Sequence, residues 1–236
     1  MMKRFLLIAL VLLGQQAYAQ KKIFKATNTT PSNQGEGLAN NDIISGLREA
    51  LKVGTNNSTA SASKLDGFYK NPMIKIPFPR EIRDAESTLR SMGMDKEVDK
   101  FVKTLNRAAE DAAKSAAPIF INSIQHITIN DGLTILRGGN DAATQFLKTT
   151  SNAALIAAFK PIVQNSLNKV KITQYWNPLM STYNKVPFVK KVNPDLNQYV
   201  TDKAIEGLFK LIAAEELKIR KDPAARINDI LKSVFG

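Results

Sequence analysis

Apolar residues recur at helical spacing from Asp42 onwards, and this pattern sets the predicted fold class. The first helical face carries Ile43, Ile44, Leu47, Ala50 and Leu51, at the i, i+3, i+4 spacing of an amphipathic helix. A longer helix is predicted from Asp95 towards Ala116, with an apolar face made of Val98, Phe101, Val102, Leu105, Ala108, Ala109 and Ala112. The sequence shows no convincing succession of strands, so the prediction is an all-α, single-domain, irregular helical bundle with two proline-rich extended straps.

Punctuating residues predict where these helices begin and end. A helix starting at Arg80 is expected to end at Gly93, Asp95 to cap the next helix, and Pro118 to stand in the first turn of another. Asp195 or Asn197 is expected to open the last long helix. A short final helix should start at Pro223.

Two stretches have less usual compositions. "GTNNSTASASKL", residues 54–65, is rich in Ser, Thr and Asn, so propensity argues against a helix there unless tertiary packing overrides it. "NAALIAAFKPIVQNSL", residues 152–167, is apolar for several turns around Pro161. A helix that is apolar on most sides is typical of the central position in a bundle.

The two predicted straps are residues 67–79, "GFYKNPMIKIPFP", and residues 183–196, "YNKVPFVKKVNPDL". Their prolines exclude a regular helix. Aromatic residues gather in the straps and beside them, and core packing is the simplest role for them: Phe68, Tyr69, Phe78, Tyr175, Trp176, Tyr183 and Phe188. The alternative is an amphipathic groove for a fatty-acid or phospholipid-like ligand, with lysines near its mouth: Lys70, Lys75, Lys185, Lys190 and Lys191.

The N-terminus reads as a secretory signal peptide. Lys3 and Arg4 precede a nine-residue apolar run, and Ala17-Tyr18-Ala19 matches the cleavage pattern. The run is shorter than the ~20 residues that span a bilayer. The predicted organisation is a signal peptide at 1–19, cleaved after Ala19, a flexible tether at 20–37 and a helical domain at 38–236. The protein is therefore expected to be exported to the periplasm or cell envelope.

The formal net charge of the whole chain is +12, and cleavage after Ala19 would lower it by two. A basic excess suits nucleic acid, an anionic membrane surface or acidic glycans. Export makes nucleic acid the weakest of these, so no nucleic-acid partner is expected. The scatter of Lys and Arg along the chain also fits plain solubility.

Few residue types with catalytic or metal-binding chemistry are present. The chain has no Cys and one His, His126, so cysteine chemistry and a multi-histidine metal site are excluded. His126 is expected to be a partly buried residue near a helix end. We expect no catalytic residue, no metal site and no cofactor.

Several strings together resemble one known family. They include "DGFYKNPMIKIPFP", "LNRAAEDAAKSAAPIF", "ITINDGLTILRGGNDAATQF" and "YVTDKAIEGLFKLIAAEELKIRKDPAAR". With "GLREALKVGT" and the terminal "LKSVFG", they resemble the domain-of-unknown-function family 4197 over residues 46–236. The resemblance implies an exported, helical bacterial protein of the envelope. The family has no assigned activity, so the resemblance transfers no catalytic residue.

The stretch "TINDGLTILRGGNDAATQF", residues 128–146, contains two Asn-Asp pairs around a Gly-Gly. Thr128 and Asp131 fit a capping box, and Gly138 can end that helix in the left-handed conformation. Asn140 or Asp141 is then expected to cap the next helix. The remaining alternative is an anion bound at this second helix start by Arg137, Gly139 and Asn140. The residues that a phosphate loop or a calcium loop needs are missing.

Two further groups of polar residues stand at helical spacing. Asn106 and Glu110 are four residues apart, as are Glu216 and Arg220, with Arg226 close behind. They are either ordinary surface pairs or a buried polar network or ligand site inside the bundle. For the second case the predicted ligand-binding residues are Asn106, Glu110, Glu216, Arg220 and Arg226.

The leading functional prediction is a non-catalytic, exported helical envelope protein that binds a hydrophobic or amphipathic anionic ligand, such as a lipid, or the membrane surface. A structural or protein-interaction module of the envelope is the alternative. A second alternative is a carboxylate-dependent hydrolase, which would require Glu110 and Glu216 to face one cavity with Arg220.

Overall fold

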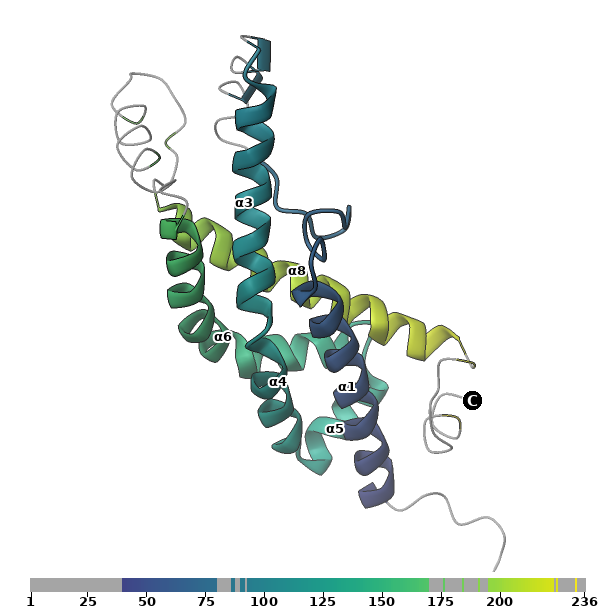
Figure 1. The fold of residues 1–236 in the computed structure, drawn as a ribbon. Coiled ribbons are helices and arrows are strands. Elements are labelled where there is room, and N and C mark those ends of the chain that lie inside the picture. The colour runs from purple at the N-terminus through teal and green to yellow at the C-terminus, as the bar shows by residue number, and fades with distance from the viewer. Residues whose placement is uncertain are drawn as a thin grey trace, which may run out of the picture. The chain divides into compact units, whose positions relative to one another are not determined.

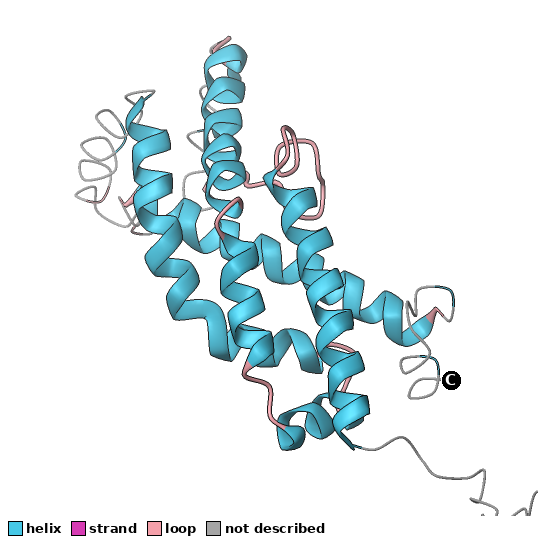
Figure 2. Ribbon diagram, turned by 60° about the horizontal axis from the view of Figure 1, so that its bottom comes forward, coloured by secondary structure: helices cyan, strands magenta, loops and turns pink. Residues whose placement is uncertain are grey.

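The computed structural model describes residues 40–79, 86–87, 90–91, 93–169, 176, 184, 191, 195–222, 224 and 232. The helices are α1 (Asn40–Ser63), α3 (Asp95–Ala113), α4 (Ala116–Gln125), α5 (Ile129–Arg137), α6 (Ala142–Lys169) and α8 (Leu196–Lys221). These residues contain no strand (Figure 2), so the all-α prediction is confirmed. The helices lie in the compact unit Gly37–Gly236.

Helix α8 packs against α6, α3 and α1, while α4 packs against α1 and α6 (Figure 1). Side chains with no exposed surface fill the space between these helices, among them Leu105, Phe120, Leu155 and Leu208. Each helix supplies one apolar stripe to this core. The exposed faces of the helices carry the polar residues, as the sequence pattern predicts.

Helix α6, which contains residues 152–167, packs on α8, α3, α4 and α5, as expected of a central helix, but it keeps one face exposed. The buried residues of α6 recur every fourth position: Ala143, Leu147, Ser151, Leu155, Phe159, Val163 and Leu167. Because a helix turns about 100° per residue, this stripe shifts by about 40° at each step and winds around α6. Four helices, α8, α3, α4 and α5, pack against α6. The helix is therefore apolar on several sides without being buried on all of them.

The expectation against a helix at residues 54–65 is also wrong, because α1 continues to Ser63. Thr55 and Ser58 donate their hydroxyls to Leu51 O and Gly54 O, each at 2.8 Å. The hydroxyls are thereby satisfied inside the helix, and the small side chains let α1 pack closely on its neighbours. Tertiary packing outweighs the local propensity here.

Residues 64–79 follow α1 and form a non-helical segment that we call the strap loop. Its first part consists of consecutive turns, with hydrogen bonds from Gly67 N to Lys64 O (2.9 Å) and from Lys75 N to Asn71 O (2.8 Å). Only the residues from Lys75 onwards leave the turns. The sequence predicted an extended chain from Gly67, and the turns differ from that because Asp66, Phe68 and Asn71 accept backbone hydrogen bonds locally.

Several helix ends follow the predictions. Thr128 and Asp131 form the capping box that begins α5, Asp195 caps α8 through Gln198 N at 3.0 Å, and Gly93 has φ +80°. Two details are wrong. The residue before α3 is Met94, so Asp95 is the first helical residue. Gly138 ends α5 with φ −77°, outside the left-handed region.

Some predictions fall outside the described residues. These are the signal peptide and tether at 1–37, most of the helix predicted from Arg80, nearly all of the second strap at 183–196, and the final helix from Pro223. Of the aromatic residues beside the second strap, Trp176 is described and is 5% exposed. Its ring stacks on Phe101 at 5.1 Å, and Phe68 and Phe78 are buried too. These three aromatics are core residues.

Candidate functional site

Asn106 lies on α3 with no exposed surface. Its amide oxygen accepts a hydrogen bond from Ile76 N, and its amide nitrogen donates to Ile76 O, both at 2.8 Å. The second amide hydrogen goes to Val102 O at 2.8 Å. The side chain thus forms with Ile76 the pair of hydrogen bonds that a neighbouring strand would form. Both amide hydrogens and the amide oxygen are used.

Glu110 lies one turn further along α3 and is 3% exposed. Its Oε1 accepts from Phe68 N at 3.1 Å and from Tyr69 N at 3.2 Å. Its Oε2 accepts from Arg107, which also binds Asp66. The pKa of Asp66 is lowered by its hydrogen bonds with Lys70 and Arg107. Glu110 and Arg107 together therefore hold the turns of the strap loop against α3.

Glu216, on α8, is 7% exposed. Its Oε1 accepts from Ala143 N at 3.0 Å, and its Oε2 accepts from the backbone N and the hydroxyl of Thr144, each at 2.8 Å. A carboxylate at this position also interacts favourably with the dipole at the start of α6. Glu216 therefore caps α6 from a distance of more than seventy residues along the chain.

Arg220 is the partner of Glu216 on the next turn of α8. Its Nε and one terminal nitrogen donate to Oε1 of Glu216 at 3.0 and 2.8 Å. The same guanidinium donates to Ile135 O at 2.8 Å, at the end of α5. The pair thus joins the end of α5 to the start of α6, across the corner that contains Gly138.

This arrangement bears on the anion-binding hypothesis for Arg137, Gly139 and Asn140, which stays a prediction. The first four backbone N–H groups of α6, from Ala142 to Gln145, all have acceptors: Gly139 O, the two oxygens of Glu216, and Asp141 O. An anion does occupy this helix start, but it is the carboxylate of Glu216. The paired arginine is Arg220, while Arg137 is exposed. The expected capping by Asn140 or Asp141 is replaced by this long-range contact.

Of the predicted ligand-binding residues, Asn106, Glu110, Glu216 and Arg220 form two networks, which share no hydrogen-bond partner within the described part of the chain. The buried alternative describes them better than surface pairing does. Their hydrogen-bonding groups are directed to the protein's own backbone. Arg226 lies outside the described residues.

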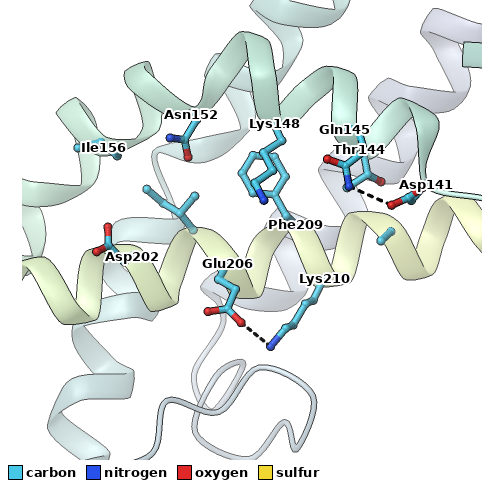
Figure 3. A pocket seen from close by; sticks show the side chains of 12 residues that line it. Asp141, Thr144, Gln145, Lys148, Asn152, Ile156, Asp202, Glu206, Phe209 and Lys210 are labelled. Carbon is cyan, nitrogen blue, oxygen red and sulfur yellow. Dashed lines mark hydrogen bonds and ion pairs between the residues drawn. The ribbon is translucent and has the colours of Figure 1, made fainter. Parts of the chain in front are cut away.

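A groove lies between α6 and α8, with a volume of about 360 Å³. We call it the α6–α8 groove. Its apolar part contains Ile156, Ile205, Phe209 and Ala213, and Figure 3 shows Phe209 between the two helices. Its charged lining residues are Asp141, Lys148, Asp202, Glu206 and Lys210. Acids therefore outnumber bases by one in this groove.

A second groove, of about 310 Å³, lies between the strap loop and α8. We call it the strap groove. The strap loop contributes Pro72, Met73, Ile74, Lys75, Ile76 and Pro77, and α8 contributes Tyr199, Lys203, Glu206, Gly207 and Lys210. Three lysines face one glutamate. Lys203 and then Lys210 hydrogen-bond to Glu206 and lower its pKa to about 2.

A third groove, of about 290 Å³, lies between α3 and α6 and is lined by Lys100, Lys103, Arg107, Asp111 and Lys169 among others. It is the most basic of the three. Its polar contacts include Ser166 donating to Asp111 at 3.1 Å.

In the part of the chain that the structure describes, no group of three or more His, Asp or Glu residues could hold a metal ion. Over the same residues, no helix is long and apolar enough to cross a membrane. His126 is exposed at the end of α4, with Nδ1 2.7 Å from Asn122 O. The helix-end position agrees with the prediction, but the expected partial burial is wrong.

The sequence reading missed the partners of the buried acids. These partners carry no motif, because each contributes a backbone group or a single hydroxyl. They are Ala143, Thr144, Ile76 and the turn at Phe68. Asp66 gives one signal, since it precedes Gly67, and Asp-Gly is a pair typical of turns. The network around Asn106 and Glu110 has partners 30 to 42 residues away, which periodicity within one helix does not reveal.

The fold and these contacts define an all-α protein in which buried acid and amide side chains hold a non-helical strap loop and a helix corner in place. The chain belongs to the family DUF4197, described as a protein of unknown function, whose model matches residues 37–236. The resemblance stated from the sequence strings is thus confirmed. Neither a curated protein nor a solved structure matches the chain.

Proposed function

We propose that the protein is a non-catalytic, exported protein of the cell envelope that binds an amphipathic anionic molecule in the strap groove. The observation that carries the proposal is the composition of this groove. It combines three lysines with apolar residues of the strap loop, and one acid opposes them. An amphipathic anion requires both features side by side.

The charge balance favours the strap groove over the α6–α8 groove. The groove between α3 and α6 is more basic, but Ala108 is the one apolar residue among those that line it. Lys75, Lys203 and Lys210 outnumber Glu206 in the strap groove by two. The α6–α8 groove has an excess of one acid, which disfavours an anion there. Since Lys203 and Lys210 both bind Glu206, Lys75 is the lysine of the strap groove that no carboxylate in the described residues binds.

The apolar part of the strap groove comes from Pro72, Met73, Ile74 and Pro77. Its volume of about 310 Å³ lies at the lower end of the range of small-molecule pockets, ~300–1,000 Å³. This size suits a phosphate or carboxylate head with the first part of an acyl chain. The rest of such a chain would extend along the surface.

The hydrolase alternative receives no support from the two buried glutamates. Among the described residues Glu110 and Glu216 have no common partner, and both oxygens of each carboxylate already accept hydrogen bonds. Glu216 and Arg220 line a cavity of about 30 Å³, which has room for about one water molecule. A general acid or base must instead reach its substrate within hydrogen-bonding distance.

The interaction-module alternative keeps one specific observation in its favour. Ala153, Ala154 and Ala157 are exposed on α6, where small residues would let another helix approach closely. A protein partner on that face would leave the strap groove empty. The experiment below separates the two.

The test has two parts. The first is native mass spectrometry and lipid extraction of the protein purified from its own host, in which a co-purifying anionic lipid is the expected result. The second is titration with dodecyl phosphate. Lys75→Ala/Lys203→Ala should weaken its binding about tenfold, since two exposed charge contacts of up to ~1 kcal/mol each are lost.

Lys100→Ala/Lys103→Ala removes the same charge from the groove between α3 and α6 and serves as the matched control. It should leave the affinity for dodecyl phosphate nearly unchanged. If the control loses affinity and the strap-groove variant keeps it, the site is wrongly placed. A protein that carries no lipid and does not bind dodecyl phosphate would reject the proposal and favour the interaction module.

A further inference from the structure

The strap loop exposes the two most accessible large apolar side chains of the described residues. Leu65 is 74% exposed and Met73 is 52% exposed, whereas Ile129 reaches 44%. A single exposed apolar residue is ordinary on a protein surface. Two such residues within nine positions of one loop call for a further explanation.

The loop that exposes these residues is built rigidly. Asp66 has φ +66°, a left-handed conformation that costs free energy for a residue other than glycine. Gly67 follows it, and a Cβ there would lie 2.3 Å from Ser61 O, so a larger residue does not fit. Leu65 therefore stands at the entrance of a tight turn that fixes its position.

Buried side chains of α3 bind this turn through hydrogen bonds. Glu110 accepts from Phe68 N and Tyr69 N, Arg107 binds Asp66, and the ring of Phe68 is fully buried. The loop consequently exposes Leu65 and Met73 without being a loose segment. The hydrogen bonds of Glu110 and Arg107 thus fix the loop that exposes these two apolar side chains.

The charges of the loop are basic. Residues 64–79 contain Lys64, Lys70 and Lys75 against a single acid, Asp66. That acid is paired with Lys70 at 2.8 Å and with Arg107. Lysines beside exposed Leu and Met are typical of segments that enter the interface of an anionic bilayer, because the apolar side chains reach below the headgroups while the ammonium groups contact phosphates.

We propose that the strap loop docks the protein on an anionic bilayer, with Leu65 and Met73 in the interface and Lys64, Lys70 and Lys75 on the phosphates. This inference rests on the proposed function in so far as both use Met73 and Lys75 of the strap loop. It differs in the occupant, which is a lipid surface and not a single amphiphile in the strap groove. The basic loop is complementary to an anionic bilayer. It is less complementary to another segment of this chain, because the chain as a whole has a net charge of +12.

The test is co-sedimentation of the protein, purified from its own host, with vesicles of phosphatidylglycerol and phosphatidylcholine. Vesicles of phosphatidylcholine alone are the comparison. The protein should bind the anionic vesicles more strongly, and raising the salt concentration should weaken this binding. Leu65→Ser/Met73→Ser should lower the affinity for anionic vesicles at least tenfold, and Lys64→Ala about fivefold.

Ile129→Ser/Leu217→Ser is the matched control, because these large apolar residues are 44% and 37% exposed elsewhere on the surface. It should bind vesicles as the unaltered protein does. The dodecyl phosphate titration separates the two proposals, since Leu65→Ser should lose vesicle binding and keep the affinity for this soluble probe. If dodecyl phosphate fails to bind while anionic vesicles do, the groove proposal falls and docking stands.

Three results would overturn docking. The unaltered protein could ignore anionic vesicles, or Leu65→Ser/Met73→Ser could bind them as well as the control does. The third is a marked loss of stability towards urea in Leu65→Ser/Met73→Ser but not in the control. That loss would mean that another part of the chain or a second copy covers these side chains.

Discussion

Glu110 and Glu216 form the same kind of buried hydrogen-bond network in two different parts of the fold. Each is a buried glutamate with an arginine on its own helix, and each accepts two backbone N–H groups from a distant part of the chain. Glu110 holds the turns of the strap loop, whereas Glu216 holds the start of α6. The arginines also differ, since Arg107 contacts a second acid, Asp66, and Arg220 contacts the end of α5.

This difference separates a local role from a global one. The N–H groups bound by Glu110 belong to the turns of a loop outside the helices, so losing this acceptor affects the loop first. Those bound by Glu216 belong to the first turn of a helix that packs on α8, α3, α4 and α5. The carboxylate of Glu216 is consequently expected to contribute more to global stability, and that of Glu110 more to the order of the strap loop.

The largest effect is expected for Glu216→Ala, which should lower the free energy of unfolding by about 3–5 kcal/mol. The substitution removes the acceptor of two helix N–H groups. It also removes the carboxylate that pairs with Arg220, whose side chain is only 10% exposed. Urea denaturation followed by circular dichroism measures the loss. Glu216→Gln should cost less, because one acceptor oxygen remains. A loss below ~1 kcal/mol for Glu216→Ala would mean that water replaces the carboxylate and that the two glutamates do not differ in this way.

Glu110→Ala should cost less, about 2–3 kcal/mol, because Arg107 is 28% exposed and keeps Asp66 as its partner. Amide hydrogen exchange provides the sharper contrast. The amides of Phe68 and Tyr69 should exchange faster in Glu110→Ala, and those of Ala143 and Thr144 should stay protected. Glu216→Ala should give the opposite pattern. Identical exchange profiles in the two variants would show that both networks belong to one cooperative unit.

Gly207→Ala tests the seat of the strap loop on α8 without touching either carboxylate. A Cβ at Gly207 would lie 2.7 Å from Phe68 Cε1 and 3.2 Å from Ile74 Cβ, so the loop must shift at a cost of about 1–3 kcal/mol. Gly54→Ala is the control. Its Cβ would meet Glu215 Cβ at an ordinary 3.8 Å, and alanine should stabilise α1 by up to ~1 kcal/mol. Thermal unfolding measures both, and equal shifts would contradict a tight seat.

The smallest effect is expected for a third glutamate, the half-exposed Glu206. Lys203 and Lys210 lower its pKa to about 2 from a reference of 4.5. Because the folded pKa is lowered, its stabilisation is present above the unfolded pKa and is lost as the pH falls from about 5 to 2. Glu206→Gln should therefore cost under ~1 kcal/mol at pH 7, after allowance for solvent screening. The difference from the unaltered protein should vanish near pH 2, and a larger loss at neutral pH would remove the contrast with the buried glutamates.

The stretch from Thr128 to Phe146 shows how far sequence reasoning reaches. The capping box of Thr128 and Asp131 could be predicted because both partners lie within one turn. Gly138 could be placed at the end of the helix for the same reason. The cap of α6 could not be predicted, because Glu216 stands 73 residues from Ala143 and nothing near Asn140 points to it. A local rule therefore predicted Asn140 or Asp141 as the cap of α6, whereas in the folded protein Glu216 of α8 caps this helix.

The sequence by itself determined that the protein is all-α, that it belongs to its family, and roughly where most helices begin. These features depend on periodicity and on contacts within a few residues. The tertiary structure alone decided that Asn106, Glu110 and Glu216 bind backbone groups of distant segments, that α1 continues through a polar stretch, and that the strap loop exposes Leu65 and Met73. The reason is physical: whether a polar side chain meets water, a ligand or another backbone depends on which segments fold against it, and that information is not local.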